Sequence, residues 1–284
     1  AAHPRNAWVL GRGWNEVLWK SGRLPTARER DAAVADRPAW MERVDGHAGW
    51  ANSAALKAAG IDRDSKDPPG GRIEHDARGE PTGVLIDGAM ELLVRAIPPP
   101  SKAQLAASLQ AALSEVASVG LTGVGDAGIN RDRFALYKEF ADAGKLSARI
   151  YALIDEVGAD FEAISAEGPL LGYGGDFLTV RAVKLYADGA LGSRGAALLA
   201  PYADAPDSRG LLFVTPEVLT AKIEKGFGRG YQVGVHAIGD AGNRQALDAF
   251  EAAYKSHSDA PALRNRVEHA QVVALSDIPR FKSL

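Results

Sequence analysis

The sequence of 284 residues contains no cysteine. This excludes disulfide bonds, cysteine nucleophiles and thiolate metal sites, so any metal ion must be held by histidine, carboxylate or a modified lysine. No apolar run approaches the roughly 20 residues that a membrane helix requires. The first residues have neither the basic start nor the apolar stretch of a secretory signal. We therefore expect a cytoplasmic protein that does not contact a membrane.

An excess of charge of one sign is also lacking, because 33 Lys and Arg stand against 36 Asp and Glu. The basic residues are scattered rather than clustered, which argues against a nucleic-acid partner. Hydrophobic residues make up 46% of the chain, as in ordinary globular proteins. The length is sufficient for the core of one large α/β domain or of two smaller domains.

Residues 1–98 contain all five tryptophans and show no regular alternation of strands and helices. We expect an irregular subdomain here, with short helices over 53–59 and 87–97. The prolines at 98–100 form a stiff boundary after it.

After this boundary, apolar strands alternate with helices. Ser101 and the Thr215-Pro216 pair are typical of helix starts. Because strands that alternate with helices are typical of a parallel sheet, the pattern predicts an α/β fold. The expected strands cover 121–125, 149–154, 178–186, 231–237 and 266–272, and the expected helices begin at 101, 131, near 161, at 215 and at 240.

Three residues at or near the ends of expected strands could carry chemistry: Lys184, His236 and His269. In parallel barrels the carboxyl ends of the strands carry the active site, and neutral imidazole is a good metal ligand. A lysine within an apolar strand is costly unless it is paired or modified. Lys184 could form a buried ion pair with Asp188 or Glu268. Alternatively, burial could lower its pKa and favour carboxylation by CO2.

Four stretches of the chain resemble one branch of the amidohydrolase superfamily, which includes N-substituted formamide deformylases and many uncharacterised metal-dependent hydrolases. The main stretch is VKLYADGALGSR at 183–194. The others are GRGW at 11–14, VDGHAGWAN at 44–52, and the segments around His236 and His269.

The resemblance implies a (β/α)8 TIM barrel in which Lys184, carboxylated, is the bridging metal ligand of strand four, with His236 and His269 as ligands on strands five and six. The family also has a His-x-His pair on strand one and a proton-shuttle Asp on strand eight, which this chain lacks. We therefore expect an incomplete barrel, strands two to six, in residues 99–284. Residues 1–98 would be an insertion after strand one that covers the barrel mouth.

The resemblance further implies hydrolysis of amide or formamide-like C–N bonds in a small molecule, an EC 3.5-type reaction, by hydroxide activated on one or two divalent metal ions, expected to be zinc. We expect His47, Trp14 and Arg194 to contact substrate. Their structural alternatives are hydrogen bonding within the insertion, core packing and capping of a carbonyl. We expect the 284-residue chain to be a truncated portion that is inactive on its own and that could lack the metal. A homo-oligomer could cover its open sheet edges.

Two rival interpretations remain open. Gly123, Gly125 and Gly128 fit the G-x-G-x-x-G pattern of an NAD-binding oxidoreductase, with Asp155 as the acidic residue. Asp155 follows Gly128 by 27 residues, whereas about 20 is usual, and this interpretation leaves Lys184 and the histidines unexplained. The second rival is a non-catalytic binding protein.

Overall fold

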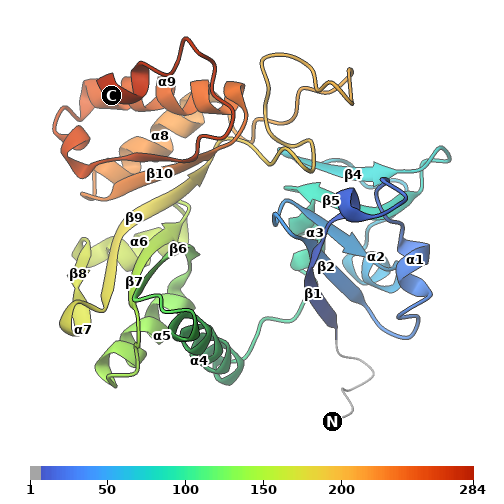
Figure 1. Cartoon of the computed structure of the whole chain (residues 1–284), viewed down its shortest axis with the longest axis horizontal. Helices are drawn as coiled ribbons and strands as arrows, with labels where there is room; N and C mark the ends of the chain where they lie inside the picture. The colour runs from blue at the N-terminus through green and yellow to red at the C-terminus, as the bar shows by residue number, and fades with distance from the viewer. Residues whose placement is uncertain (1–7) are drawn as a thin grey trace. The chain divides into compact units, whose positions relative to one another are not determined.

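The structure, a computed structural model, describes residues 8–284, which form two compact units (Figure 1). Unit 1 consists of residues 8–98, 188–214 and 238–242, and unit 2 consists of 99–187, 215–237 and 243–284. The chain therefore leaves unit 2 twice, each time directly after a strand, and returns to it. No helix within residues 8–284 is long and apolar enough to span a bilayer.

Unit 1 is built on a five-stranded sheet in the order β1-β2-β3-β5-β4, in which β1 and β2 run parallel and the other neighbours antiparallel. Its elements are β1 (Val9–Trp14), α1 (Ala27–Asp31), β2 (Ala39–Arg43), β3 (Ala48–Ala51), α2 (Ser53–Ala59), β4 (Gly71–His75), β5 (Pro81–Asp87) and α3 (Met90–Val94).

The elements of the first region do not alternate regularly, as expected, but they include a five-stranded sheet that the sequence pattern did not predict. Glycines that weaken a strand pattern in the sequence have a packing role in this sheet. A Cβ on Gly49 of β3 would lie 1.7 Å from a ring carbon of Trp40 on β2, so this glycine leaves room for the indole of the neighbouring strand. The helix expected over 87–97 is also shorter, because β5 continues to Asp87 and α3 covers only Met90–Val94.

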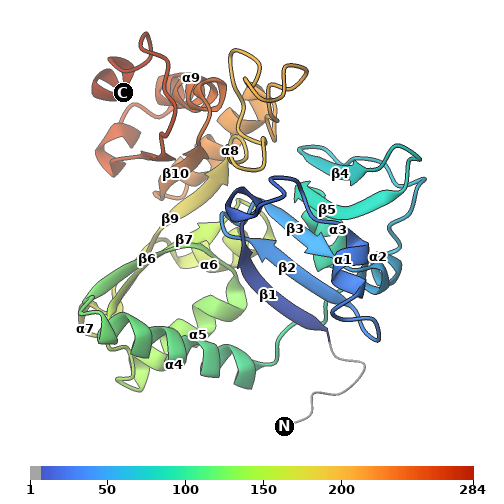
Figure 2. The same cartoon turned by 45° about the vertical axis from the view of Figure 1, so that its right-hand side comes forward.

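Unit 2 contains a curled sheet of parallel strands in the order β11-β10-β9-β7-β6, with the short β8 antiparallel to β9 (Figures 1 and 2). Its elements are α4 (Lys102–Ser118), β6 (Gly123–Ile129), α5 (Arg131–Asp142), β7 (Arg149–Asp155), α6 (Ala159–Ile164), β8 (Leu170–Gly172), α7 (Tyr173–Asp176), β9 (Leu178–Tyr186), α8 (Pro216–Phe227), β10 (Gln232–Ala237), α9 (Asp240–Ser256), β11 (Arg266–His269) and α10 (Arg280–Ser283).

The predicted α/β class is confirmed, with five parallel strands near the expected positions. The numbering of these strands as two to six of an incomplete barrel, and the placement of residues 1–98 over its mouth, stay predictions. Two helix starts have the expected caps. The Ser101 side chain accepts a hydrogen bond from the Gln104 N–H, and the Thr215 side chain accepts one from the Val218 N–H.

The glycine motif lies in a different place from the one that dinucleotide binding requires. Gly123, Gly125 and Gly128 all lie within β6, and α5 starts only after the Asn130 cap. In a dinucleotide fold the glycines form the turn between strand and helix, where the helix N-terminus meets the pyrophosphate. The structure therefore argues against the NAD-binding interpretation.

Candidate functional site

Lys184 lies in the last third of β9 and is only 4% exposed. Burial lowers the pKa of its amine from 10.5 to about 8, and the Glu268, Asp155 and Glu156 carboxylates partly oppose this. Within residues 8–284 it has no ion pair. Its Nζ lies 3.7 Å from the centre of the Tyr186 ring, and its hydrogen bond to the Leu185 carbonyl is long, at 3.5 Å. The expected ion pair with Asp188 or Glu268 is therefore absent.

His236 and His269 lie side by side at the carboxyl ends of β10 and β11. His236 is 2% exposed, whereas His269 is exposed. Their ring centres are 4.6 Å apart and the ring planes make an angle of 72°. The backbone of His269 and Ala270 is left-handed, with φ of 76° and 45°. This turn ends β11 at His269, three residues earlier than predicted.

Tyr186 lies next to both Lys184 and His236. It follows Lys184 by two residues on β9 and is the register partner of His236 on β10, so all three side chains share one face of the sheet. Its ring centre is 5.8 Å from that of His236, and its hydroxyl donates to Asp155 Oδ1 at 3.1 Å. Burial, with Asp155 next to it, raises the Tyr186 pKa well above its usual range. The hydroxyl therefore stays protonated and acts as a donor.

Glu268 borders the same group from β11. A Cβ on Gly234 would lie 2.9 Å from Glu268 Oε1, so the missing side chain leaves room for this carboxylate beside β10. Arg266 Nη2 pairs with the same oxygen at 2.6 Å. The carboxylate raises the pKa of Lys184. Gly234 thus allows a residue of β11 to act electrostatically on a residue of β9.

His236 and His269 are better arranged to bind a metal ion than the set of three that includes Lys184. Rings 4.6 Å apart and strongly inclined are compatible with two imidazole ligands of one ion. Lys184, in contrast, faces the Tyr186 ring. Among the described residues, no set of three or more His, Cys, Asp or Glu side chains is arranged to hold a metal. Residues 8–284 therefore provide an imidazole pair and a nearby buried amine, and no set of three such ligands.

In unit 1, His47 pairs with a buried carboxylate. Its Nδ1 lies 2.7 Å from Asp87 Oδ1, and the Asp87 side chain is fully buried. Cβ atoms on Gly189 and Gly195 would lie 2.4 and 2.1 Å from Asp87 Oδ2, so these two glycines make the space for the carboxylate. Burial raises the pKa of Asp87, and His47 opposes that rise.

Trp14 and Arg194 have structural partners in unit 1. Trp14 is 6% exposed, and its ring lies 6.0 Å from that of Trp19 and 6.3 Å from that of Trp50. It therefore belongs to the core. Arg194 is half-exposed and pairs with Asp204 at 3.0 Å rather than capping a carbonyl.

Asp188, in the 183–194 motif, binds backbone N–H groups of two loops. Its carboxylate accepts hydrogen bonds from the N–H groups of Ala197, Ile238 and Gly239 at 2.8–2.9 Å. Burial raises its pKa to about 6, and these three donors oppose the rise. The acid thus joins two loops of unit 1 that are distant in the sequence.

Sequence reasoning did not identify Tyr186, Asp87 or Gly234 as parts of a site. The i, i+2 spacing of Tyr186 from Lys184 on one strand was a usable signal. No such signal marks Asp87 and Gly234 in the sequence, because their roles depend on contacts with His47 and Glu268, which are 40 and 34 positions away.

Known proteins resemble the whole chain. The model of the amidohydrolase family (Amidohydro_3) matches residues 1–284. The putative amidohydrolase YtcJ of Bacillus subtilis is 37% identical over 278 residues, which cover 95% of this chain and 50% of YtcJ. An N-substituted formamide deformylase of Arthrobacter pascens is 35% identical over 147 residues, covering 50% of this chain and 27% of the deformylase.

The chain also resembles solved structures of metal-dependent hydrolases. The crystal structure of an uncharacterised metal-dependent hydrolase from Pyrococcus horikoshii superposes with a TM-score of 0.69 at 26% identity, covering 99% of this chain and 53% of that one. The chain thus spans about half the length of the proteins it matches. Since the family model matches from the first residue to the last, the chain belongs to the amidohydrolase family.

Proposed function

We propose that this chain belongs to a longer protein, and that this protein is a metal-dependent hydrolase of amide or formamide-like C–N bonds in small molecules. The single observation that supports the proposal is the pair of His236 and His269 rings, 4.6 Å apart at the carboxyl ends of β10 and β11, with Lys184 near the carboxyl end of the adjacent β9. The amidohydrolase and deformylase relatives support C–N chemistry, and the metal-dependent hydrolase structures support a divalent ion. We propose zinc as the ion and the cytoplasm as the location.

His236 and His269 would hold the ion, because their rings already lie at a separation that suits a shared metal. When bound, the metal supplies Lewis-acid activation of water and of the scissile carbonyl. The rigid strands β10 and β11 keep the imidazoles in place before substrate arrives.

We propose that Lys184 becomes carboxylated. The pKa of about 8 gives its amine a larger neutral fraction at neutral pH than an exposed lysine has. The neutral Nζ attacks the carbon of CO2, a new N–C bond forms, and one N–H proton is lost to solvent, which leaves an anionic carbamate. The modification changes a cation over the Tyr186 ring into an oxygen ligand.

For substrate binding we propose His47, Trp14 and Arg194. His47 has the strongest support, because Asp87 holds its ring in one orientation. Trp14 would act as a buried wall rather than as a direct hydrogen-bonding partner, and Arg194 would have to exchange its Asp204 ion pair for a substrate carboxylate.

The test uses the longer protein, elemental analysis and a panel of amides and formamides. We expect bound divalent metal and turnover, and in His236→Gln a loss of both by about 10- to 100-fold. His75→Gln is the matched control, because His75 is exposed at the end of β4. A metal-free protein with full turnover, or His236→Gln with unchanged metal and turnover, would overturn the proposal.

Carboxylation of Lys184 is tested separately by ¹³C NMR in ¹³C-bicarbonate. A carbamate signal is expected in the unaltered protein and should be missing in Lys184→Met. A signal that persists in this variant would show that the carbamate lies elsewhere.

A further inference from the structure

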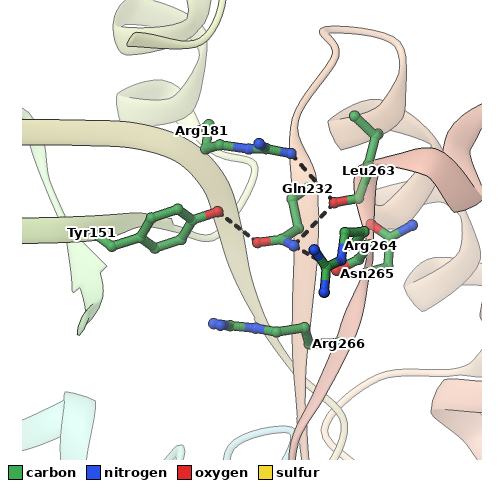
Figure 3. Close-up of a pocket in the computed structure, with 7 residues that line it drawn as sticks. All are labelled: Tyr151, Arg181, Gln232, Leu263, Arg264, Asn265 and Arg266. Carbon is green, nitrogen blue, oxygen red and sulfur yellow. Dashed lines mark hydrogen bonds between the residues drawn. The ribbon is translucent and has the colours of Figure 1, made fainter. Parts of the chain in front are cut away.

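A pocket of about 470 Å³ opens in unit 2 at the amino ends of the parallel strands (Figure 3). Gln232 and Arg266 are the first residues of β10 and β11, and Arg181 and Tyr151 lie in the first half of β9 and β7. Lys184, His236 and His269 lie toward the other ends of the same strands. The pocket is therefore a separate feature from the candidate metal site.

The lining of this pocket is rich in cations. Arg181, Arg264 and Arg266 contribute guanidinium groups, and no Asp or Glu lines it. Arg266 shares its charge with Glu268, at 2.6 Å. Within the described part of the chain, Arg181 and Arg264 have no ion-pair partner. The contact shown for Arg181 in Figure 3 is a 3.4 Å hydrogen bond to the Leu263 carbonyl. The pocket thus holds more positive charge than its surroundings neutralise.

The polar groups at the floor of the pocket already have hydrogen-bond partners. Gln232 is 7% exposed, its Oε1 accepts from the Tyr151 hydroxyl at 2.6 Å, and its Nε2 donates to the carbonyls of Leu263 and Arg264. These bonds use the main acceptors of the floor (Figure 3). The groups with hydrogen-bonding capacity left are therefore the guanidinium N–H donors, which select a ligand that accepts several hydrogen bonds and carries negative charge.

Two of the arginines line the pocket together with Tyr151, and the Arg266 guanidinium carbon lies 6.0 Å from the centre of the Tyr151 ring. Arg181 and Arg266 both lower the pKa of the Tyr151 hydroxyl, although burial raises that pKa more. Arginine guanidinium groups that line one pocket can each donate several hydrogen bonds, and such donors suit phosphate oxygens. The pocket volume exceeds that of one phosphate, so room remains for an attached organic group.

We propose that this pocket is a binding site for a phosphate group, free or carried by a small phosphomonoester. Arg181 and Arg264 supply the charge that has no ion-pair partner within residues 8–284, and Arg266 adds further N–H donors. The site is independent of the proposed hydrolase activity, because it needs neither metal nor turnover.

The experiment is calorimetric titration of the chain with inorganic phosphate and with glucose 6-phosphate, in chloride buffer of matched ionic strength. We expect saturation at one site. Arg181→Gln and Arg264→Gln should each weaken binding about tenfold, because each removes a charge-assisted hydrogen bond. Tighter binding of inorganic phosphate would identify the free ion as the ligand, and tighter binding of the monoester would identify a phosphorylated metabolite.

Arg133→Gln is the matched control. Arg133 is exposed on α5 and, like Arg181, donates to one backbone carbonyl, that of Gly128 at 3.1 Å. It should leave the affinity unchanged. Three results would overturn the proposal: no saturable binding of either phosphate compound, equal weakening by Arg133→Gln and the pocket variants, or binding of hexaglutamate without binding of phosphate, which would indicate an acidic protein segment as the occupant.

Discussion

The imidazole Nδ1 of His47 lies 2.7 Å from Oδ1 of Asp87. When the Asp87 carboxylate is ionised it can only accept, so Nδ1 then carries the proton and the tautomer of the ring is determined. His47 lies in the turn between β2 and β3, Asp87 is the last residue of β5, and the His47 carbonyl also accepts the Asp87 N–H at 3.1 Å. Side chain and backbone therefore both hold the pair together.

The pair leads to a first prediction, Asp87→Asn in the longer protein. The backbone at Asp87 has φ of 48°, which asparagine tolerates well, so the fold should persist. Without the carboxylate the His47 tautomer is no longer determined. If His47 contacts substrate, kcat/KM should fall at least tenfold, about 1.4 kcal/mol of transition-state stabilisation.

Steady-state kinetics and thermal melting check this together. Asp62→Asn is the control, because Asp62 is exposed and its carboxylate accepts hydrogen bonds from the Asp64 N–H and the Ser65 hydroxyl, away from the proposed substrate residues. Unchanged kcat/KM in Asp87→Asn would remove His47 from the proposed substrate site.

The second prediction concerns pH and Lys184 in the metal-free chain. Its pKa is about 8 in the folded state and 10.5 ordinarily, so between these values the unfolded state binds more protons. The Lys184 contribution to the free energy of unfolding therefore rises with pH from about 8 to 10.5, by roughly 3 kcal/mol at most. Lys184→Met should be more stable than the unaltered chain at pH 7, and this advantage should shrink toward pH 10.5.

Urea unfolding at pH 7, 9 and 10.5 measures the difference. Lys145→Met, at an exposed position after α5, should leave a constant difference across the series. A constant difference for Lys184→Met as well would show that the amine is not desolvated as the structure indicates.

The third prediction concerns Asp188, whose pKa is raised from 3.8 to about 6. The folded state binds the proton more readily, so the Asp188 contribution to stability falls as pH rises from about 4 to 6, by roughly 2–3 kcal/mol. Asp188→Asn cannot titrate. The free energy of unfolding of the unaltered chain, relative to this variant, should therefore decrease across this range.

Asp240→Asn is the appropriate comparison, because Asp240 also accepts a loop N–H, from Leu199 at 2.8 Å, yet is less buried. The difference in free energy of unfolding between Asp240→Asn and the unaltered chain should not change in this way from about pH 4 to 6. Parallel stability profiles for Asp188→Asn and the unaltered chain would contradict the prediction.

The fourth prediction is that Gly234→Ala destabilises the chain by about 1–3 kcal/mol, because the new methyl group meets Glu268 Oε1 at 2.9 Å and Leu153 at 3.2 Å. Gly125→Ala on β6 is the control, since its Cβ would meet only Tyr151 O at 3.9 Å. Chemical unfolding of both variants tests this prediction. Equal free energies of unfolding for Gly234→Ala and Gly125→Ala would show that the Glu268 side chain can move away from the new methyl group.

The sequence predicted β9 and β10 well because both are continuous apolar runs, and residues such as Val183, Leu185, Val233 and Val235 are fully buried. The cluster of Lys184, His236 and His269 could be predicted for the same reason. Polar residues near the ends of neighbouring parallel strands are brought close by the sheet itself.

The sheet of unit 1 could not be predicted in this way. Its strands are stabilised by contacts such as that of Trp40 with the surface of Gly49, and a single-sequence pattern interprets that glycine as a break. Likewise β6 carries three glycines in seven residues, and its strand character comes from pairing with β7 rather than from its own side chains.

The three hydrogen bonds that Asp188 accepts have a consequence for the order of folding during synthesis on the ribosome. Residues 8–98 emerge before unit 2, yet the loop that encloses the Asp87 carboxylate begins at residue 188, and the turn that satisfies Asp188 ends near residue 242. Unit 1 therefore stays open at this side until more than half of unit 2 has been translated. Its early segments depend on partners made much later, which makes slow translation or truncation between residues 98 and 242 a cause of misfolding.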